Sequence, residues 1–271
     1  MLFSALLTPV LVAVMVSAVP TFEERYTQRA ARRTAGRHLT YPLEAAAIPG
    51  AATVEGNIGV FETYYSAAWS GAVLYYSKGT SWQNVTGTFT VPTPQEPYNA
   101  TGFHSASAWV GLDGYNCNNL LQTGVDFAVN GDKVTYTPWY EWYPASAKDF
   151  SGFPIHAGDT ITATVVATSS TNGTATLFNH ATGVEVTHTF SNQPALCNVS
   201  AEWIVEDYVQ NGNRVPLSDF GTINFTDISA ERSTGPVDPS GARIYEIEQN
   251  GTKLTSVSVT DSSVIVSYIG P

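Results

Sequence analysis

The segment from Ser105 to Tyr143, SASAWVGLDGYNCNNLLQTGVDFAVNGDKVTYTPWYEWY, contains three runs in which apolar and polar residues alternate. Alternation with a period of two is typical of strands that bury one face. Asn130-Gly131, between the second and third runs, is a residue pair typical of two-residue hairpin turns. The segment therefore predicts antiparallel strands over residues 105–113, 120–127 and 133–143.

The rest of the chain from residue 64 onward has the same character. Short alternating runs are separated by Gly, Asn, Asp and Ser, with further turn pairs at Asn172-Gly173 and Asn250-Gly251, and no long run has a helical period. This pattern predicts an all-β antiparallel sandwich or barrel. Further strands are expected at residues 68–76, 82–91, 160–168, 174–179, 184–190, 202–209, 221–227, 244–249, 253–259 and 263–268.

Composition narrows the classes of function. The 271 residues include 12 basic and 23 acidic side chains, which gives a net charge of −11 at pH 7. This balance argues against nucleic acid as a partner, because phosphate contacts need basic residues. Two cysteines cannot build a Cys-rich zinc site, and no His-Glu-x-x-His sequence is present, so no metal or other cofactor is expected.

The first 18 residues have the features of a cleaved signal peptide. Leu2 to Val16 is almost wholly apolar, and Val16-Ser17-Ala18 supplies small residues at the expected cleavage point. The apolar run is shorter than the roughly 20 residues that a membrane span needs, and Pro9 interrupts it. We therefore expect a secreted protein that is not attached to a membrane.

Residues 19–54 are predicted to form a basic propeptide ahead of one folded domain, residues 55–271. Between Thr21 and Gly50 lie five arginines and three glutamates, whereas the folded domain is strongly acidic. Opposite charges favour a propeptide that binds the domain as an intramolecular inhibitor and loosens in acid, when carboxylates are protonated. The alternative is a disordered tail without a role.

Cys117 and Cys197 are the only cysteines, and in a secreted chain we expect them to form a disulfide. The alternative, a catalytic thiol and a spare one, needs an oriented histidine that the sequence does not suggest. Six Asn-x-Ser/Thr sequences are candidates for glycosylation: Asn84, Asn99, Asn172, Asn198, Asn224 and Asn250.

Alternation also predicts which polar residues share a face. On the predicted strands, one face would carry Trp109, Asp113, Gln122, Asp126, Trp139, Glu141, Glu202 and Glu206. An acidic groove lined by aromatic residues would suit a polymer substrate, either peptide or glycan. The alternative is an ordinary solvated sheet face. Exposed Trp109 and Trp139 would favour binding, although both could instead pack under a loop.

Known catalytic motifs leave carboxylates as the best candidates for acid–base chemistry. The sequence has no Gly-x-Ser-x-Gly and no Asp-Thr/Ser-Gly, which disfavours serine hydrolases and pepsin-type dyads. Glu202 and Glu206 would lie roughly 13 Å apart along one strand, at ~3.3 Å per residue. A catalytic glutamate therefore needs a partner from another strand.

Four ordered blocks resemble the fungal glutamic peptidases, or eqolisins: Ser107–Gly114, Leu121–Phe127, Trp139–Pro144 and Ala201–Asp207. The resemblance extends from about Tyr65 to Tyr268. It implies a lectin-like sandwich of two antiparallel sheets with roughly seven strands each. It also implies a secreted acid endopeptidase that acts on polypeptides and is insensitive to pepstatin. We expect a monomeric single chain.

The resemblance also implies roles for individual residues. Glu206 would act on water as general base and then as general acid, and Gln122 would stabilise the oxyanion. Trp109, Asp113, Asp126, Trp139 and Glu141 would contact the substrate in the groove. Two departures affect specificity rather than the catalytic pair. The interval from Cys117 to Gln122 is one residue shorter than in familiar members, and Thr137-Pro138 replaces Asp-Ala.

Two other functions remain open from the residues alone. A β-sandwich glycoside hydrolase would use two carboxylates beside aromatic residues, here Glu141 and Glu206. A lectin-like binding module would bind its ligand without turnover and would tolerate loss of Glu206. The predicted basic propeptide favours a zymogen, because neither of the other two functions needs to be silenced.

Overall fold

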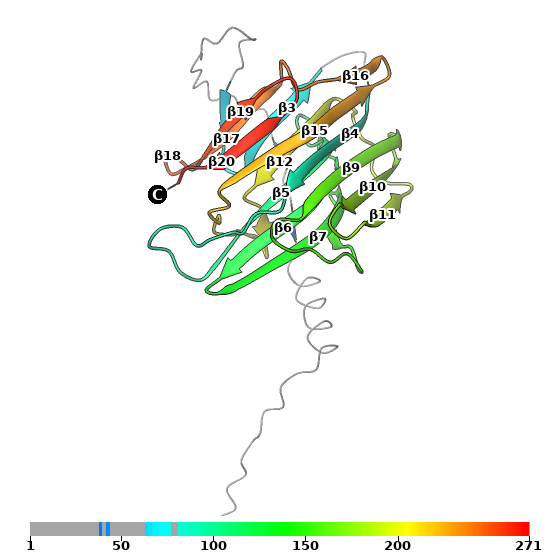
Figure 1. The fold of residues 1–271 in the computed structure, drawn as a ribbon. Helices are drawn as coiled ribbons and strands as arrows, with labels where there is room; N and C mark the ends of the chain where they lie inside the picture. Colours follow the sequence, from blue (N-terminus) through cyan, green and yellow to red (C-terminus); the bar gives the residue numbers. More distant parts are fainter. Residues whose placement is uncertain (1–37, 40–41, 44–62, 77–80, 271) are drawn as a thin grey trace, which may run out of the picture. The chain divides into compact units, whose positions relative to one another are not determined.

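Two large β-sheets pack face to face in the computed structural model, which describes residues 38–39, 42–43, 63–76 and 81–270 (Figure 1). The described residues contain no α-helix, so the all-β sandwich expected from the sequence is confirmed. Within them, no helix has the length and apolarity needed to cross a lipid bilayer.

The first sheet carries most of the residues singled out from the sequence. Its strand order is β18 (Thr252–Lys253), β17 (Arg243–Gln249), β3 (Trp69–Tyr75), β12 (Ser200–Glu206), β5 (Phe103–Asp113), β6 (Leu120–Asn130), β7 (Lys133–Tyr143) and β8 (Lys148–Asp149). These strands pair antiparallel, and β2 (Thr63–Ser66) adds a parallel pairing on β17.

The second sheet covers the inner face of the first. Its order is β11 (Val184–Phe190), β10 (Asn172–Asn179), β9 (Thr160–Ser169), β4 (Trp82–Thr90), β15 (Thr222–Arg232), β20 (Val264–Tyr268) and β19 (Thr255–Val259), with β16 (Gly235–Val237) paired to β15. A small third sheet joins β1 (His38–Leu39), β13 (Val209–Gln210) and β14 (Asn213–Arg214).

Local chemistry explains where the strands depart from expectation. The strand expected over 202–209 ends at Glu206, because the chain leaves the first sheet there. Tyr208 donates its hydroxyl to Ser105 Oγ at 2.9 Å. Asn172-Gly173 is not a turn: both residues belong to β10, beside a register shift. Asn250-Gly251 is confirmed as the two-residue loop between β17 and β18, and both residues have positive φ.

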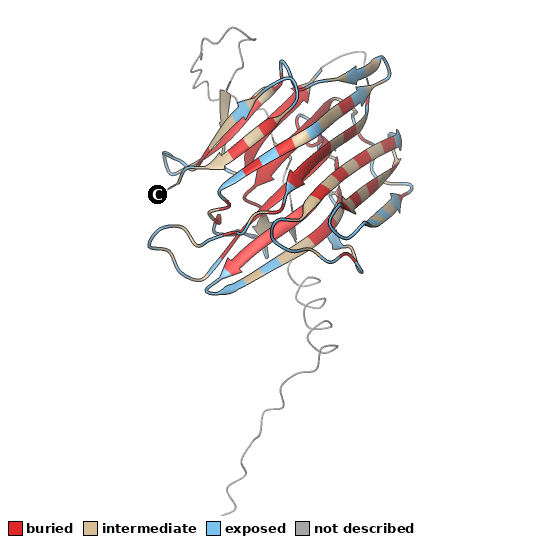
Figure 2. Ribbon diagram, in the orientation of Figure 1, coloured by how far each residue is buried: buried red, intermediate tan, exposed pale blue. Residues whose placement is uncertain are grey.

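The core between the sheets is apolar and combines aliphatic with aromatic side chains. Trp203 reaches from the first sheet to the second, where its Nε1 donates to the Thr86 carbonyl at 2.8 Å. Strands β9 and β10 of the second sheet alternate buried and half-buried residues, as strands with one solvated face should (Figure 2). By contrast, β12 is buried at every position, and so are β5 and β6 except at one end.

A second apolar cluster accounts for much of this burial and lies on the outer face of the first sheet. We call it the outer-face cluster; its buried members are Trp69, Val73, Trp109, Tyr115, Leu120, Trp139, Ile204 and Tyr245. Among the half-buried residues that pack against it are Leu43, Tyr64 and Tyr75. The outer face of this sheet is therefore a covered surface rather than a solvated one.

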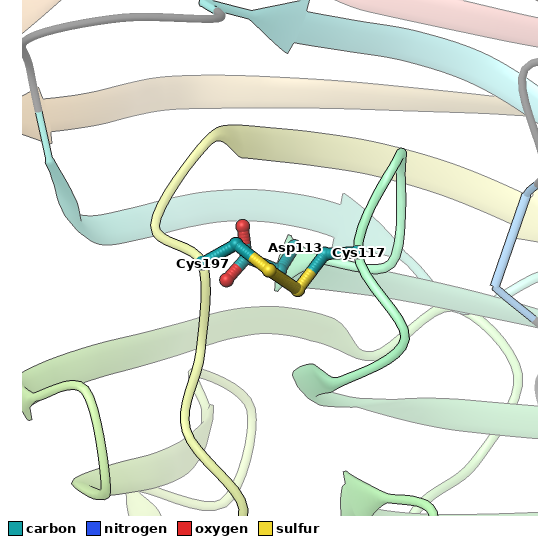
Figure 3. Close-up of side chains that lie close together, drawn as sticks. All are labelled: Asp113, Cys117 and Cys197. Atoms are coloured by element: carbon teal, nitrogen blue, oxygen red, sulfur yellow. A yellow bond between two sulfur atoms is a disulfide. The ribbon is translucent and has the colours of Figure 1, made fainter.

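The expected disulfide between Cys117 and Cys197 is present, and it joins the β5–β6 loop to the segment before β12 (Figure 3). Asp113 lies beside it and accepts the main-chain N–H groups of Asn198 and Val199, both at 2.7 Å. Among the described residues, these three are the only group with three metal-ligand atoms within 4.8 Å of one another. Because the two sulfurs form a disulfide and the carboxylate accepts main-chain hydrogen bonds, we interpret this group as a structural link rather than a metal site.

Removal of the disulfide should destabilise the fold. Cys117→Ser combined with Cys197→Ser opens a closed loop with a sequence separation of 80 residues. The chain-entropy relation gives a loss of about 4 kcal/mol in the free energy of unfolding. Denaturant unfolding of the double variant and wild type measures the difference. A midpoint equal to that of wild type would show that the Asp113 contacts alone hold the two segments together.

Candidate functional site

The register of four strands places the predicted site residues in three parallel rows across the outer face of the first sheet. The first row contains Glu206, Ser107, Asp126 and Thr137; the second contains Ile204, Trp109, Gly124 and Trp139; the third contains Glu202, Gly111, Gln122 and Glu141. The sequence predicted that these carboxylates, the carboxamide and the tryptophans would share one surface, and they do.

Direct hydrogen bonds hold the polar side chains of these rows. Trp109 Nε1 donates to Glu206 Oε2 at 2.9 Å, so the indole of the second row orients the carboxyl of the first. Gln122 Nε2 donates to Glu141 Oε2 at 2.5 Å. Trp139 Nε1 donates to Ser107 Oγ at 3.1 Å. Each tryptophan therefore supplies both an apolar ring and a fixed donor.

Trp109 and Trp139 are buried, with 0% and 1% of their surface exposed. Of the two arrangements open from the sequence, the exposed one is therefore wrong for this chain. Gly124 lies between them in register, and a Cβ there would come within 2.2 Å of the Ala108 carbonyl oxygen and 2.5 Å of Trp109 Cβ. Only glycine allows this close approach of the neighbouring strand.

The carboxyl groups of the third row favour the protonated form. Burial raises the pKa of Glu141 well above its usual range, and the negative charges of Glu206 and Asp126 raise it further, although the hydrogen bond from Gln122 opposes this. Burial, followed by the charge of Asp113, likewise raises the pKa of Glu202. The third row therefore holds two carboxyl groups whose ionisation is unfavourable because they are buried.

One predicted groove residue, Asp113, differs from expectation in its surroundings. Asp113 ends β5 with a φ of 72° and directs both carboxylate oxygens to the main chain ahead of β12. It therefore fixes the start of that strand. Thr137, one of the two departures noted in the sequence, lies opposite Asp126 in the first row.

Two residues that matter to the site were not predicted. Ser107 lies between Glu206 and Asp126 in register and accepts the Trp139 indole N–H, but a serine in a strand carries no specific signal. Asp207, directly after Glu206, is buried; its Oδ2 accepts Gln249 Nε2 at 2.6 Å. Burial raises the pKa of Asp207 to about 7, although the Gln249 hydrogen bond and the charge of Arg214 oppose the rise.

Comparison with known proteins gives a consistent result. A family model described as the Peptidase A4 family matches residues 67–268. Aspergillopepsin-2 from Aspergillus niger is 40% identical over 289 residues, which span 99% of this chain and 100% of that protein. Scytalidopepsin B from Scytalidium lignicola is 38% identical over 228 residues, which span 80% of each chain.

Two solved structures share the fold. The crystal structure of scytalido-glutamic peptidase with a transition state analog inhibitor has a TM-score of 0.68 at 38% identity, covering 75% of this chain and 98% of that one. Aspergilloglutamic peptidase from Aspergillus niger has a TM-score of 0.60 at 47% identity, covering 61% and 99%. With the family model and the relatives in agreement along most of the sequence, the chain belongs to the Peptidase A4 family of glutamic peptidases, the eqolisins.

Proposed function

We propose that this protein is a secreted, pepstatin-insensitive acid endopeptidase whose catalytic pair is Glu206 and Gln122. The observation that carries the proposal is that both side chains lie on the outer face of one sheet, each fixed by a direct hydrogen bond. Family membership supports polypeptide substrates, and the apolar leader at residues 1–18 supports secretion. The proposal includes a glycosylated monomer, with the six Asn-x-Ser/Thr sequences as candidate sites.

The chemistry of the pair needs no covalent intermediate. The Glu206 carboxylate takes a proton from a water molecule while the water oxygen attacks the scissile carbonyl carbon. The Gln122 amide has two N–H bonds; one is directed at Glu141, and the second can donate to the oxyanion that forms. When the carbon–nitrogen bond breaks, the protonated Glu206 returns its proton to the leaving amine.

The surrounding groups explain an acid working range. Glu141 keeps its proton in acid, since burial and the charges of Glu206 and Asp126 raise its pKa. A neutral Glu141 adds no negative charge beside Glu206 and still accepts the Gln122 amide. As the pH rises and Glu141 ionises, its charge repels that of Glu206, and we expect peptide hydrolysis to decline.

Replacement of either residue of the proposed catalytic pair should lower the rate of peptide hydrolysis. Glu206→Gln should lower kcat by about 10²–10⁴-fold, because the general base is lost. Gln122→Ala should lower kcat by about 10²–10³-fold, because one oxyanion donor is lost. Digestion of a denatured protein at acid and neutral pH, with pepstatin present, measures both. Thermal unfolding of each variant shows whether the fold is intact.

Glu141→Gln is the matched control for this pair, because its amide oxygen can still accept from Gln122. We expect it to retain much of the acid activity and to alter the decline toward neutral pH. If folded wild type instead hydrolyses glycans, and on these Glu141→Gln is as inactive as Glu206→Gln while Gln122→Ala is normal, the glycoside hydrolase alternative is favoured. A folded mature protein that cleaves no polypeptide would favour the binding module.

We also propose that residues 19–54 inhibit the enzyme before processing. His38–Leu39 pairs with Val209–Gln210, three residues beyond Glu206. Leu43 donates its N–H to the Gly114 carbonyl at 2.7 Å, just beyond Asp113. Since β12 and β5 run antiparallel, these two attachments lie at opposite ends of the three rows. The five arginines of this segment add attraction to the acidic domain.

A synthetic propeptide of residues 19–54 should bind the mature Glu206→Gln protein more weakly in acid. Its affinity should fall by tenfold or more between pH 7 and pH 3, because protonated carboxyls no longer attract arginine. Fluorescence anisotropy with a labelled peptide measures this. A scrambled peptide of the same composition is the control. Equal binding of the two peptides would show non-specific charge attraction and would contradict a docked inhibitor.

The buried carboxyl of Asp207 should make the free energy of unfolding depend on pH. A carboxyl with a raised pKa in the folded state keeps its proton where the unfolded chain has lost it, so the free energy of unfolding falls as the pH rises. For Asp207 this window runs from its ordinary value of 3.8 to about 7. Asp207→Asn removes that titration while its amide oxygen can still accept the Gln249 amide.

The expected result is a flatter profile of unfolding free energy against pH for Asp207→Asn. Its gain over wild type at pH 7 should be on the order of 4 kcal/mol at most. Urea unfolding from pH 3 to pH 8 measures it, and Asp261→Asn, which removes an exposed carboxylate, serves as control. Parallel curves for wild type and Asp207→Asn would show that Asp207 is not the titrating group.

A further inference from the structure

Four tyrosines form a rigid aromatic patch beside the three rows; we call it the tyrosine cluster (Tyr64, Tyr75, Tyr115 and Tyr245). Tyr64 stacks on Tyr245 with ring centroids 5.4 Å apart, and Tyr75 meets Tyr115 edge-on at 4.9 Å. Tyr115 and Tyr245 are 5.9 Å apart. The four rings therefore form one continuous chain of aromatic contacts.

Arg243 braces the tyrosine cluster. Its guanidinium carbon lies 5.0 Å from the Tyr75 ring centre and 5.3 Å from that of Tyr115, and its Nη1 donates to the Tyr115 hydroxyl. A guanidinium held this way is attracted electrostatically to the faces of the aromatic rings. Its positive charge also makes the patch unfavourable for lysine or arginine side chains of a ligand.

The cluster continues the apolar floor of the candidate active site. Tyr245 lies opposite Gly71, and Gly71 lies opposite Ile204, so Tyr245 extends the row that contains Trp109 and Trp139. Tyr115 and Tyr245 are buried members of the outer-face cluster, and Tyr64 and Tyr75 pack against it. No gap in the apolar surface separates the tyrosines from the tryptophans.

Leu43 shows how a polypeptide engages this surface. Its N–H donates to the Gly114 carbonyl at 2.7 Å, and its carbonyl accepts the Asn116 N–H at 3.4 Å, so the two bonds flank Tyr115. Its side chain packs against the outer-face cluster. This combination of main-chain pairing and one apolar anchor is a general mode of recognising extended peptides.

We propose that the tyrosine cluster is a substrate subsite for one large apolar side chain, which Leu43 occupies before processing. The inference rests on the proposed function in one respect, that cleavage occurs beside Gln122. Gln122 lies opposite Gly111, four residues before Tyr115. Because β5 ends at Asp113, where the chain turns with a positive φ, Tyr115 lies beyond the third row, and the subsite accepts a side chain at one fixed position away from the bond that is cut.

The test is a double-mutant cycle on binding, which needs no turnover. Peptides of residues 38–48, with Leu43 or with Leu43→Ala, are titrated into mature Glu206→Gln protein with and without Tyr115→Ala. Loss of the leucine should weaken binding by tenfold or more with Tyr115 present, and by much less with Tyr115→Ala. Equal losses in the two proteins overturn the proposal. Tyr75→Ala replaces Tyr115→Ala if the latter fails to fold.

Cleavage specificity provides the second measurement. Active mature enzyme, given a peptide library, should select Leu, Phe or Met and reject Lys and Arg at one fixed position away from the cut. A flat preference at every such position overturns the subsite even if the cycle shows coupling. Coupled binding without any cleavage by folded wild type instead contradicts the proposed function and leaves the peptide-binding surface supported.

Discussion

The register of β12, β5, β6 and β7 is the constraint on which the rest of the structure depends. The inner faces of these strands contribute Val110, Leu121 and Trp203 to the core between the sheets, and their outer faces hold the candidate site. Because side chains alternate, a slip of one residue would exchange the two sets. Packing of the core therefore determines which carboxyls and amides can meet in the groove.

The same arrangement explains why acid suits this fold. Apolar residues cover the outer face, so the carboxyls placed there are buried, and their ionisation is costly. Protonation of Glu141 and Glu202 removes that cost without breaking the hydrogen bond between Glu141 and Gln122. In the proposed mechanism, the one carboxyl that must be ionised, Glu206, shares this face with carboxyls whose neutral form burial favours.

Local patterns were enough to predict the strands and the shared face, since alternation and turn pairs reflect backbone geometry. They could not predict that Trp109 and Trp139 are buried, because the cover comes from residues distant in sequence. Nor could they predict the orientation of Asp113. Its place in the alternation puts it with the groove, but a positive φ at the strand end directs its carboxylate to the segment before β12. The roles proposed for Gln122 and Glu206 come from family resemblance, because periodicity alone cannot distinguish a catalytic carboxamide from a structural one.

Two kinds of force act on a peptide in this groove, and they respond differently to pH. In the proposed inhibition, attraction between the arginines of residues 19–54 and the carboxylates of the domain needs ionised acids and fades as the pH falls. Main-chain pairing at Gly114 and Asn116, and apolar contact of Leu43 with the outer-face cluster, involve no titrating group. In acid, therefore, a basic inhibitor loses the part of its affinity that a substrate does not need. Under the two proposals, a polypeptide substrate that carries an apolar residue at the tyrosine cluster would keep its own contacts, so the same surface would release residues 19–54 and bind substrate under the same conditions.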